Sequence, residues 1–103
     1  MLVERRQSEI HGSGVFSREF ILKDNWAYIY GEVIPLQPHP MEHYCMEHDH
    51  GQWLPYAPWC WLNHSEDPNC EFAWDEDEEI YCLIALRLIE PDEELTIDYG
   101  YQP

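Results

Sequence analysis

The sequence of 103 residues predicts a mostly β fold made of several short strands. Aromatic and β-branched runs, which favour strands, alternate with turn-forming clusters of Gly, Pro, Asp and Asn. No segment shows the apolar period of a long amphipathic helix. The length fits one domain over residues 1–103, large enough for a core of its own.

In the first half of the chain, Gly12-Ser13-Gly14 interrupts polar sequence and precedes an apolar pair, which predicts a turn entering a strand. The run Trp26–Tyr30 predicts a strand that stops at Gly31, although residues 32–34 could continue it. The stretch from His39 to Pro58 predicts little regular structure, at most a short helix around Met41 to Met46.

In the second half, Cys70–Trp74 and Ile80–Leu86 are predicted strands. The five acidic residues 75–79 join them, and such a run of like charge predicts an exposed hairpin tip. A turn at Pro91–Glu93 then leads into a final predicted strand, Leu95–Tyr99.

The chain is strongly acidic, with 21 acidic and 5 basic residues and a net charge of −16. From Gln52 onward, thirteen acidic residues face only Arg87. Direct binding of nucleic acid is not expected, because phosphates would be repelled. A basic protein or peptide is the expected partner, drawn in by the negative field. The alternative is that the charge serves solubility or reflects a salt-loving host.

No apolar run is long enough to cross a membrane, and the N-terminus lacks the apolar segment of a signal peptide. We therefore expect an intracellular protein, cytoplasmic or nuclear, without a membrane partner. Four cysteines stand at positions 45, 60, 70 and 82 without a Cys-x-x-Cys pair. This spacing argues against a zinc ribbon and favours free thiols.

Two runs carry the functional signal. The segment Trp61–Cys70 holds the pair Asn63-His64 beside a proline-stopped turn, and the segment Glu94–Tyr101 ends in two tyrosines. Together with the upstream Gly12-Ser13-Gly14, they resemble the paired signature of the SET domain, the fold of protein-lysine methyltransferases. The resemblance covers residues 6–101. It implies several small β-sheets with a pseudoknot-like C-terminal crossing.

The resemblance also implies a site. S-adenosylmethionine would be the cofactor, and Tyr99 would act in catalysis by orienting the methyl group, because a phenol is a poor base at neutral pH. Phe72 resembles the family's Phe/Tyr switch position, where phenylalanine implies transfer of more than one methyl group. The cofactor-binding residues would be Gly12, Ser13, Gly14, Asn63, His64 and Tyr99, and the substrate-channel residues Tyr30, Phe72, Trp74 and Tyr101.

Several positions depart from the family pattern. Ile29 stands where the family has a tyrosine, Cys60 where an arginine is common, and Glu66 where many members have a zinc-binding cysteine. With the cysteine-rich tail also absent after Pro103, no metal site is expected. The missing channel wall would come from the segment His39–His50, from a second subunit in a homodimer, or from the substrate.

Other interpretations of the same residues remain open. The glycine turn could be a plain β-turn, His64 an ordinary partly buried histidine, and the aromatic residues sheet core. A catalytically inactive peptide-binding module with the same fold is the main alternative function. The four histidines and one cysteine in the segment His39–His50 leave a metal-binding protein as a third.

Overall fold

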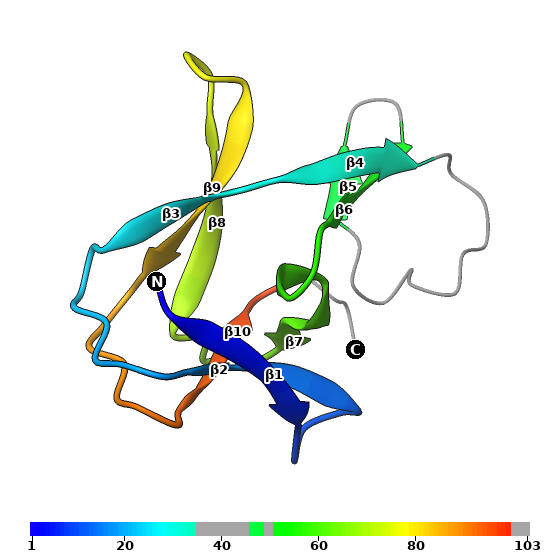
Figure 1. Cartoon of the computed structure of the whole chain (residues 1–103). Coiled ribbons are helices and arrows are strands. Elements are labelled where there is room, and N and C mark those ends of the chain that lie inside the picture. The colour runs from blue at the N-terminus through cyan, green and yellow to red at the C-terminus, as the bar shows by residue number, and fades with distance from the viewer. Residues whose placement is uncertain (35–45, 49–50, 100–103) are drawn as a thin grey trace.

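The computed structural model of the chain describes residues 1–34, 46–48 and 51–99 (Figure 1). Short strands dominate these residues, as the sequence predicts, and no helix among them is long and apolar enough to cross a membrane. The elements follow one another as β1 (Val3–Gln7), β2 (Ser13–Ser17), β3 (Trp26–Ile29), β4 (Gly31–Ile34), β5 (Met46–His48), β6 (Gly51–Pro55), the 3₁₀ helix η2 (Trp59–Trp61), β7 (Asn63–His64), β8 (Cys70–Asp75), β9 (Ile80–Ala85) and β10 (Glu94–Ile97).

The described strands form three small sheets, with the orders β1-β2-β10-β7, β3-β9-β8 and β4-β6-β5. One nearly continuous segment supplies both β3 and β4 and so joins two of the sheets (Figure 1). Strand β3 ends at Ile29, and Gly31 begins β4, so residues 32–34 continue the segment, which is the alternative that the sequence left open. A Cβ at Gly31 would lie 2.5 Å from the carbonyl oxygen of Leu54 and 2.8 Å from the Trp53 ring, so only glycine lets β4 and β6 come this close.

The C-terminal strand β10 lies between β2 and β7. It runs antiparallel to β2 and parallel to β7, where Thr96 pairs with Asn63 and Ile97 with His64. The carbonyl oxygen of Ile97 also accepts a 3.0 Å hydrogen bond from the amide of Ser65. Strand β10 therefore lies directly beside the Asn-His segment, in agreement with the predicted C-terminal crossing.

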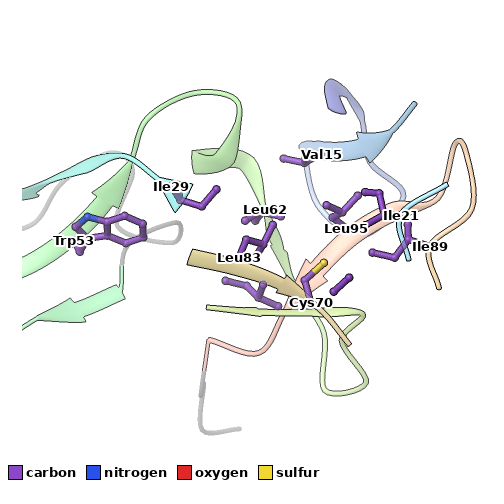
Figure 2. Packing of buried hydrophobic residues seen from close by; sticks show 11 residues of the cluster. Val15, Ile21, Ile29, Trp53, Leu62, Cys70, Leu83, Ile89 and Leu95 are labelled. Carbon is purple, nitrogen blue, oxygen red and sulfur yellow. The ribbon is translucent and has the colours of Figure 1, made fainter. Parts of the chain in front are cut away.

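A single cluster of buried apolar side chains connects the sheets (Figure 2). Leu62, Leu83 and Cys70 lie in its centre, with no exposed surface, and Trp53 from β6 extends it at one end. Around them pack Val15, Ile21, Ile29, Ala85, Ile89, Leu95 and Ile97. Cys70 is therefore a small core residue.

Strands β8 and β9 form a hairpin in which Cys70 pairs with Ala85 at one end and Asp75 pairs with Ile80 at the other. Its acidic tip is exposed, which confirms the prediction for residues 75–79, although Asp75 itself is half-buried at the end of β8. Asp75 Oδ1 accepts hydrogen bonds from the amides of Asp77 and Glu78 and so shapes the turn. Residues at the tip thus carry their charge into solvent while the strands below enter the core.

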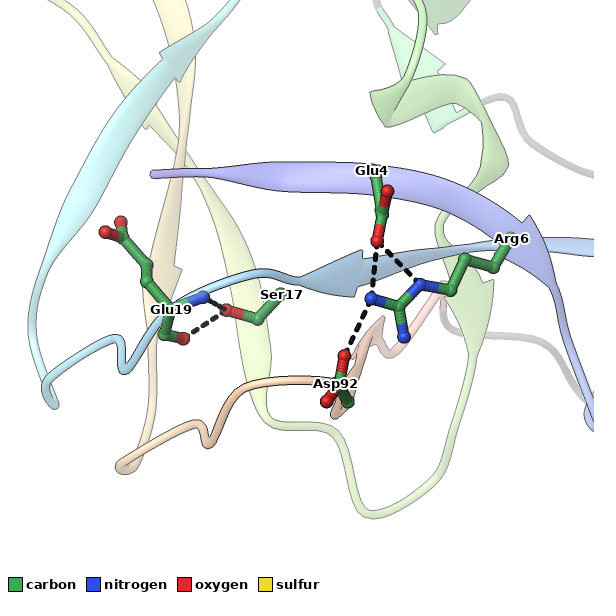
Figure 3. Close-up of polar contacts among 5 residues, drawn as sticks. All are labelled: Glu4, Arg6, Ser17, Glu19 and Asp92. Atoms are coloured by element: carbon green, nitrogen blue, oxygen red, sulfur yellow. Dashed lines mark hydrogen bonds and ion pairs between the residues drawn. The ribbon is translucent and has the colours of Figure 1, made fainter.

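Strand β1 has no counterpart among the predicted elements, because its sequence is polar and charged. Pairing with β2 holds it at the edge of its sheet. The Arg6 guanidinium donates to the carboxylates of both Glu4 and Asp92, which ties β1 to the turn before β10 (Figure 3). Nearby, the Ser17 hydroxyl donates to the Glu19 carbonyl oxygen and accepts from its amide, closing the turn after β2. Pairing with β2, rather than the strand preference of its own residues, makes β1 a strand.

The stretch from His39 to Pro58, which the sequence left without regular structure, contains β5 and β6, and η2 follows directly after it. Residues 41–45 of the short helix suggested there lie outside the described residues, and Met46 begins strand β5. The final strand is also shorter than expected, since β10 ends at Ile97 rather than at Tyr99.

Candidate functional site

The glycine turn lies at the start of β2. Gly12 has a φ of 45°, which favours glycine, and its carbonyl oxygen accepts a 2.7 Å hydrogen bond from the Ser8 amide. Ser13 and Gly14 already belong to β2, so the turn ends one or two residues earlier than the sequence suggested. The Gly-x-Gly run therefore contains the last residue of the turn, Gly12, and the first two residues of β2.

Asn63 holds this turn through its side chain. The Nδ2 amide donates to the carbonyl oxygen of His11 at 3.0 Å, to that of Ser13 at 3.0 Å, and to Glu94 Oε2 at 2.8 Å. Two amide hydrogens are shared among three protein acceptors, so the donor capacity of Asn63 is used within the protein. Its side chain acts by fixing the turn, and any ligand contact as a donor falls to the backbone.

Glu94 is a site residue that the sequence reasoning missed. Besides Asn63, its carboxylate accepts hydrogen bonds of 2.7 and 2.9 Å from the Ser8 hydroxyl. A Cβ on Gly14 would overlap this carboxylate, so glycine at position 14 makes room for Glu94. No local pattern marks Glu94, because its partners Ser8 and Asn63 lie far away in the sequence.

Asn69 is a second such residue, with a side chain that is 2 % exposed. Its Nδ2 atom donates to the carbonyl oxygen of Glu94 at 2.8 Å and to Glu93 Oε2 at 2.9 Å, and its Oδ1 accepts from the Thr96 amide at 2.8 Å. These bonds satisfy a buried amide and fix the register of β10. The register in turn positions Glu94 and Tyr99.

Tyr99 follows β10 and contacts both ends of the Asn-His segment. Its hydroxyl donates to the carbonyl oxygen of Leu62 at 2.8 Å, and its amide donates to His64 Nδ1 at 3.0 Å. The hydroxyl hydrogen is therefore directed at the backbone, and the lone pairs of the phenol oxygen point elsewhere. Such an oxygen can face an electron-poor group.

The tautomer of His64 follows from these contacts. Its Nδ1 lies 3.0 Å from the Tyr99 amide and 3.6 Å from Asp98 Oδ1. The first contact needs a lone pair on Nδ1 and the second needs a proton there, so both cannot hold at once. The shorter bond assigns the lone pair to Nδ1 and the proton to Nε2. His64 Nδ1 thus accepts a hydrogen bond from the backbone of Tyr99, with the half-exposed Asp98 beside the crossing.

The expected channel residues divide between two cavities. Phe72 from β8 lines a cavity of about 240 Å³ together with Ile97 and Asp98. Tyr30 and Trp74 line a different cavity, of about 550 Å³, near the tip of the β8–β9 hairpin. The structure thus brings Tyr30 and Trp74 together and places Phe72 beside the end of β10, which Tyr99 follows. Tyr101 lies outside the described residues.

The departure at position 29 falls in the core. Ile29 is fully buried, while its neighbours point away from it, as successive side chains of a strand do. The Tyr28 hydroxyl donates to Asp75 Oδ2 at 3.1 Å. Burial raises the pKa of Tyr28 most, and the hydrogen bond to Asp75 raises it further. Tyr30 is 66 % exposed. Neither tyrosine occupies the place of the buried Ile29.

The described residues contain no group of three or more His, Cys, Asp or Glu side chains arranged for a metal ion. Of the segment His39–His50, only residues 46–48 are described, as β5, so the histidine-rich candidate site lies outside the described side chains. Cys60, Cys70 and Cys82 are free thiols. Burial raises the pKa of the Cys70 thiol to about 12, so it is a poor nucleophile or metal ligand.

Comparison with known proteins agrees with this geometry. The family model of the SET domain matches residues 12–100. Among solved structures, a Plasmodium falciparum protein described as a candidate histone methyltransferase is similar to this chain, with a TM-score of 0.77 and 27% sequence identity. The similarity covers 98% of this chain and 95% of that one. The match to the family model spans the glycine turn, the Asn-His segment and the Asp98-Tyr99 pair. Because it covers most of the sequence, this chain is a member of the SET-domain family.

Proposed function

We propose that this protein transfers methyl groups from S-adenosylmethionine to a lysine of a basic protein. The observation that carries the proposal is the meeting of three segments, from β2, β7 and the end of β10, at one place. Asn63 joins β7 to β2 through the carbonyl oxygen of Ser13 and to β10 through Glu94, and Tyr99 joins the segment after β10 to β7. Membership of the SET family supports the same reaction class.

The donors and acceptors present suit this cofactor. When bound, S-adenosylmethionine supplies an electron-poor methyl group on a positively charged sulfur. The Tyr99 oxygen, with its hydrogen given to Leu62, presents lone pairs suited to that charge. Gly12 is exposed, and its turn would approach the polar parts of the cofactor through the backbone.

A lysine must lose its proton before it can attack, since the pKa of a lysine in water is about 10.4. Desolvation among aromatic rings lowers a lysine pKa and so favours the neutral amine. Phe72, which lines the small cavity together with Leu86 and Ile97, would contribute an aromatic ring to such surroundings near the end of β10. Tyr99 would orient the methyl group rather than accept the proton.

The test has two parts. Calorimetry on chelator-treated protein should show binding of S-adenosylmethionine and of its demethylated product without added metal. Mass spectrometry of a pool of basic proteins, incubated with protein and cofactor, should then show methylated lysines. Absence of cofactor binding would refute the proposal.

One observation favours a second candidate, a catalytically inactive module that binds basic peptides. The position of a family tyrosine is filled by Ile29, which is buried in the core and offers no hydroxyl. Cofactor binding without any turnover on basic proteins would support this module over the enzyme.

A further inference from the structure

A cavity of about 550 Å³ lies between the tip of the β8–β9 hairpin and the junction of β3 with β4. Four aromatic rings line it, from Tyr30, Trp53, Trp74 and Tyr81. The Tyr81 ring centroid lies 4.4 Å from that of Trp53 and 4.9 Å from that of Trp74. Trp53 is 6 % exposed, whereas Trp74 and Tyr30 are 44 % and 66 % exposed. The cavity therefore has a buried aromatic end and an open aromatic mouth.

Carboxylates line the same cavity. Glu78 and Glu79 reach it from the hairpin turn, and Glu32 from β4, and all three are exposed. None of the described residues lining the cavity is basic. Negative charge at the mouth of an aromatic cavity favours a cation over a neutral or anionic ligand.

Arginine is the cation that suits both features best. Its planar guanidinium stacks on aromatic faces and is less strongly hydrated than an ammonium, so entering an aromatic cavity costs it less. It also forms paired hydrogen bonds with carboxylates. We propose that this cavity binds an arginine side chain of the substrate protein, at a fixed place along the chain from the target lysine.

The fixed spacing follows from a row of rings. Trp53 contacts Tyr81 inside the cavity and Phe72 outside it, at a centroid distance of 5.4 Å. Phe72 in turn lines the smaller cavity beside Ile97, the last residue of β10, shortly before Tyr99. A substrate with lysine near Phe72 would place another residue over the larger cavity. In this respect the inference rests on the proposed function, because it takes the bound peptide to be the substrate.

The first experiment measures peptide binding without cofactor or turnover. Fluorescence anisotropy would compare labelled peptides that contain one lysine and one arginine, with the arginine moved stepwise along an otherwise neutral sequence. All have the same charge, so the general negative field affects them equally. We expect one spacing to bind roughly five- to tenfold tighter than the others, the scale of a favourable cation–π contact with a carboxylate nearby. Equal binding at every spacing would overturn the proposal.

Two replacements of that arginine separate shape from charge. Citrulline keeps the shape and removes the charge, and we expect the tighter binding to disappear. Lysine keeps the charge and removes the planar group, and we expect most of the gain to be lost. If citrulline binds as tightly as arginine, the cavity does not select a cation. If lysine does, the assignment to arginine is wrong.

Matched double variants place the effect in the cavity. Glu78→Gln with Glu79→Gln removes two charges that line it, and Glu76→Gln with Asp77→Asn removes two from the same exposed turn that do not. The first pair should weaken the best peptide by roughly fivefold and the second by less than about twofold. Equal losses would show a general field and overturn the site.

These outcomes are independent of the fate of the proposed function. Spacing-dependent arginine binding without methyl transfer would leave the cavity assigned and remove the enzyme. Methyl transfer that ignores arginine position would keep the enzyme and overturn the cavity.

Discussion

Glu94 Oε2 accepts a 2.8 Å hydrogen bond from the side-chain amide of Asn63. The two residues come from neighbouring parallel strands, and the same carboxylate occupies the space that a side chain at position 14 would need. One acidic side chain thus links the glycine turn, the Asn-His segment and the C-terminal strand. The integrity of the candidate cofactor site depends on it.

Replacing Glu94 should therefore weaken cofactor binding. Glu94→Ala removes the acceptor for Asn63 and Ser8, and we expect the dissociation constant of S-adenosylmethionine to rise roughly tenfold, the equivalent of one lost charge-assisted hydrogen bond. Glu94→Gln keeps one acceptor oxygen and should cost less. Calorimetry measures both, with exposed Glu90→Ala as the control. Equal affinities for Glu94→Ala and wild type would remove Glu94 from this role.

Tyr99→Phe tests the phenol itself. The change removes the hydroxyl that donates to Leu62 and should lower the free energy of unfolding by about 1 kcal/mol. We expect kcat to fall by roughly ten- to a hundredfold at every methylation step, because the oriented oxygen is lost. Affinity for S-adenosylmethionine should change little. Tyr56→Phe, at an exposed position, serves as the control. A loss of cofactor affinity with kcat unchanged would contradict an orienting role.

Phe72 concerns the product rather than the rate. A hydroxyl added by Phe72→Tyr would enter the small cavity beside Ile97 and Asp98 and could hold a water molecule or the substrate amine. We expect wild type to add more than one methyl group and Phe72→Tyr to shift the product toward monomethyl-lysine. Intact-mass analysis of a short lysine peptide measures the distribution. An unchanged distribution would make Phe72 a packing residue only.

Ionic strength should govern substrate capture. The chain carries a net charge of −16, and screening shortens its reach from a Debye length of about 10 Å at 0.1 M salt to about 3 Å at 1 M. The Michaelis constant for a basic peptide should rise with salt, while kcat changes less. A neutral peptide with one lysine is the control. If both peptides respond alike, the charge serves solubility instead.

Cys70 makes stability depend on alkaline pH. Burial holds its pKa at about 12 in the folded protein, against 9.0 for a thiol exposed to water. Between pH 9 and about 12, the Cys70 thiol keeps its proton in the folded state and releases it in the unfolded state. The contribution of Cys70 to the free energy of unfolding is therefore complete below pH 9 and is lost as pH rises toward 12. The shift corresponds to about 4 kcal/mol at most. Denaturant unfolding of Cys70→Ala should show lower stability at neutral pH and a flatter decline in the alkaline range. A decline parallel to that of wild type would contradict this.

Much of the fold could be predicted from the sequence because local patterns determine it. Aromatic and β-branched runs indicated β3, β8 and β9, and the acidic run indicated the hairpin tip. Strand β1 could not be predicted this way, since its charged residues form a strand only through pairing with β2 and through the bridge from Arg6 to Asp92.

The candidate site divides in the same manner. Its backbone segments are visible as short motifs, but Glu94 and Asn69 act through partners that lie far away in the sequence. Phe72 lines one cavity, and Tyr30 and Trp74 line another. This separation likewise depends on where each residue lies along the β8–β9 hairpin or the β3–β4 segment. Pattern alone fixes neither a distant partner nor a position along a sheet.

The parallel pairing of β10 with β7 couples ligand binding to the docking of these two strands. Thr96 meets Asn63 only after a loop of more than thirty residues has closed, and the entropy of that closure must be overcome before any site exists. A ligand that binds across the closed crossing therefore stabilises strand docking by mass action. Slower hydrogen exchange at the amides of Thr96 and Tyr99, both bonded across the crossing, would report occupancy of the site even without turnover.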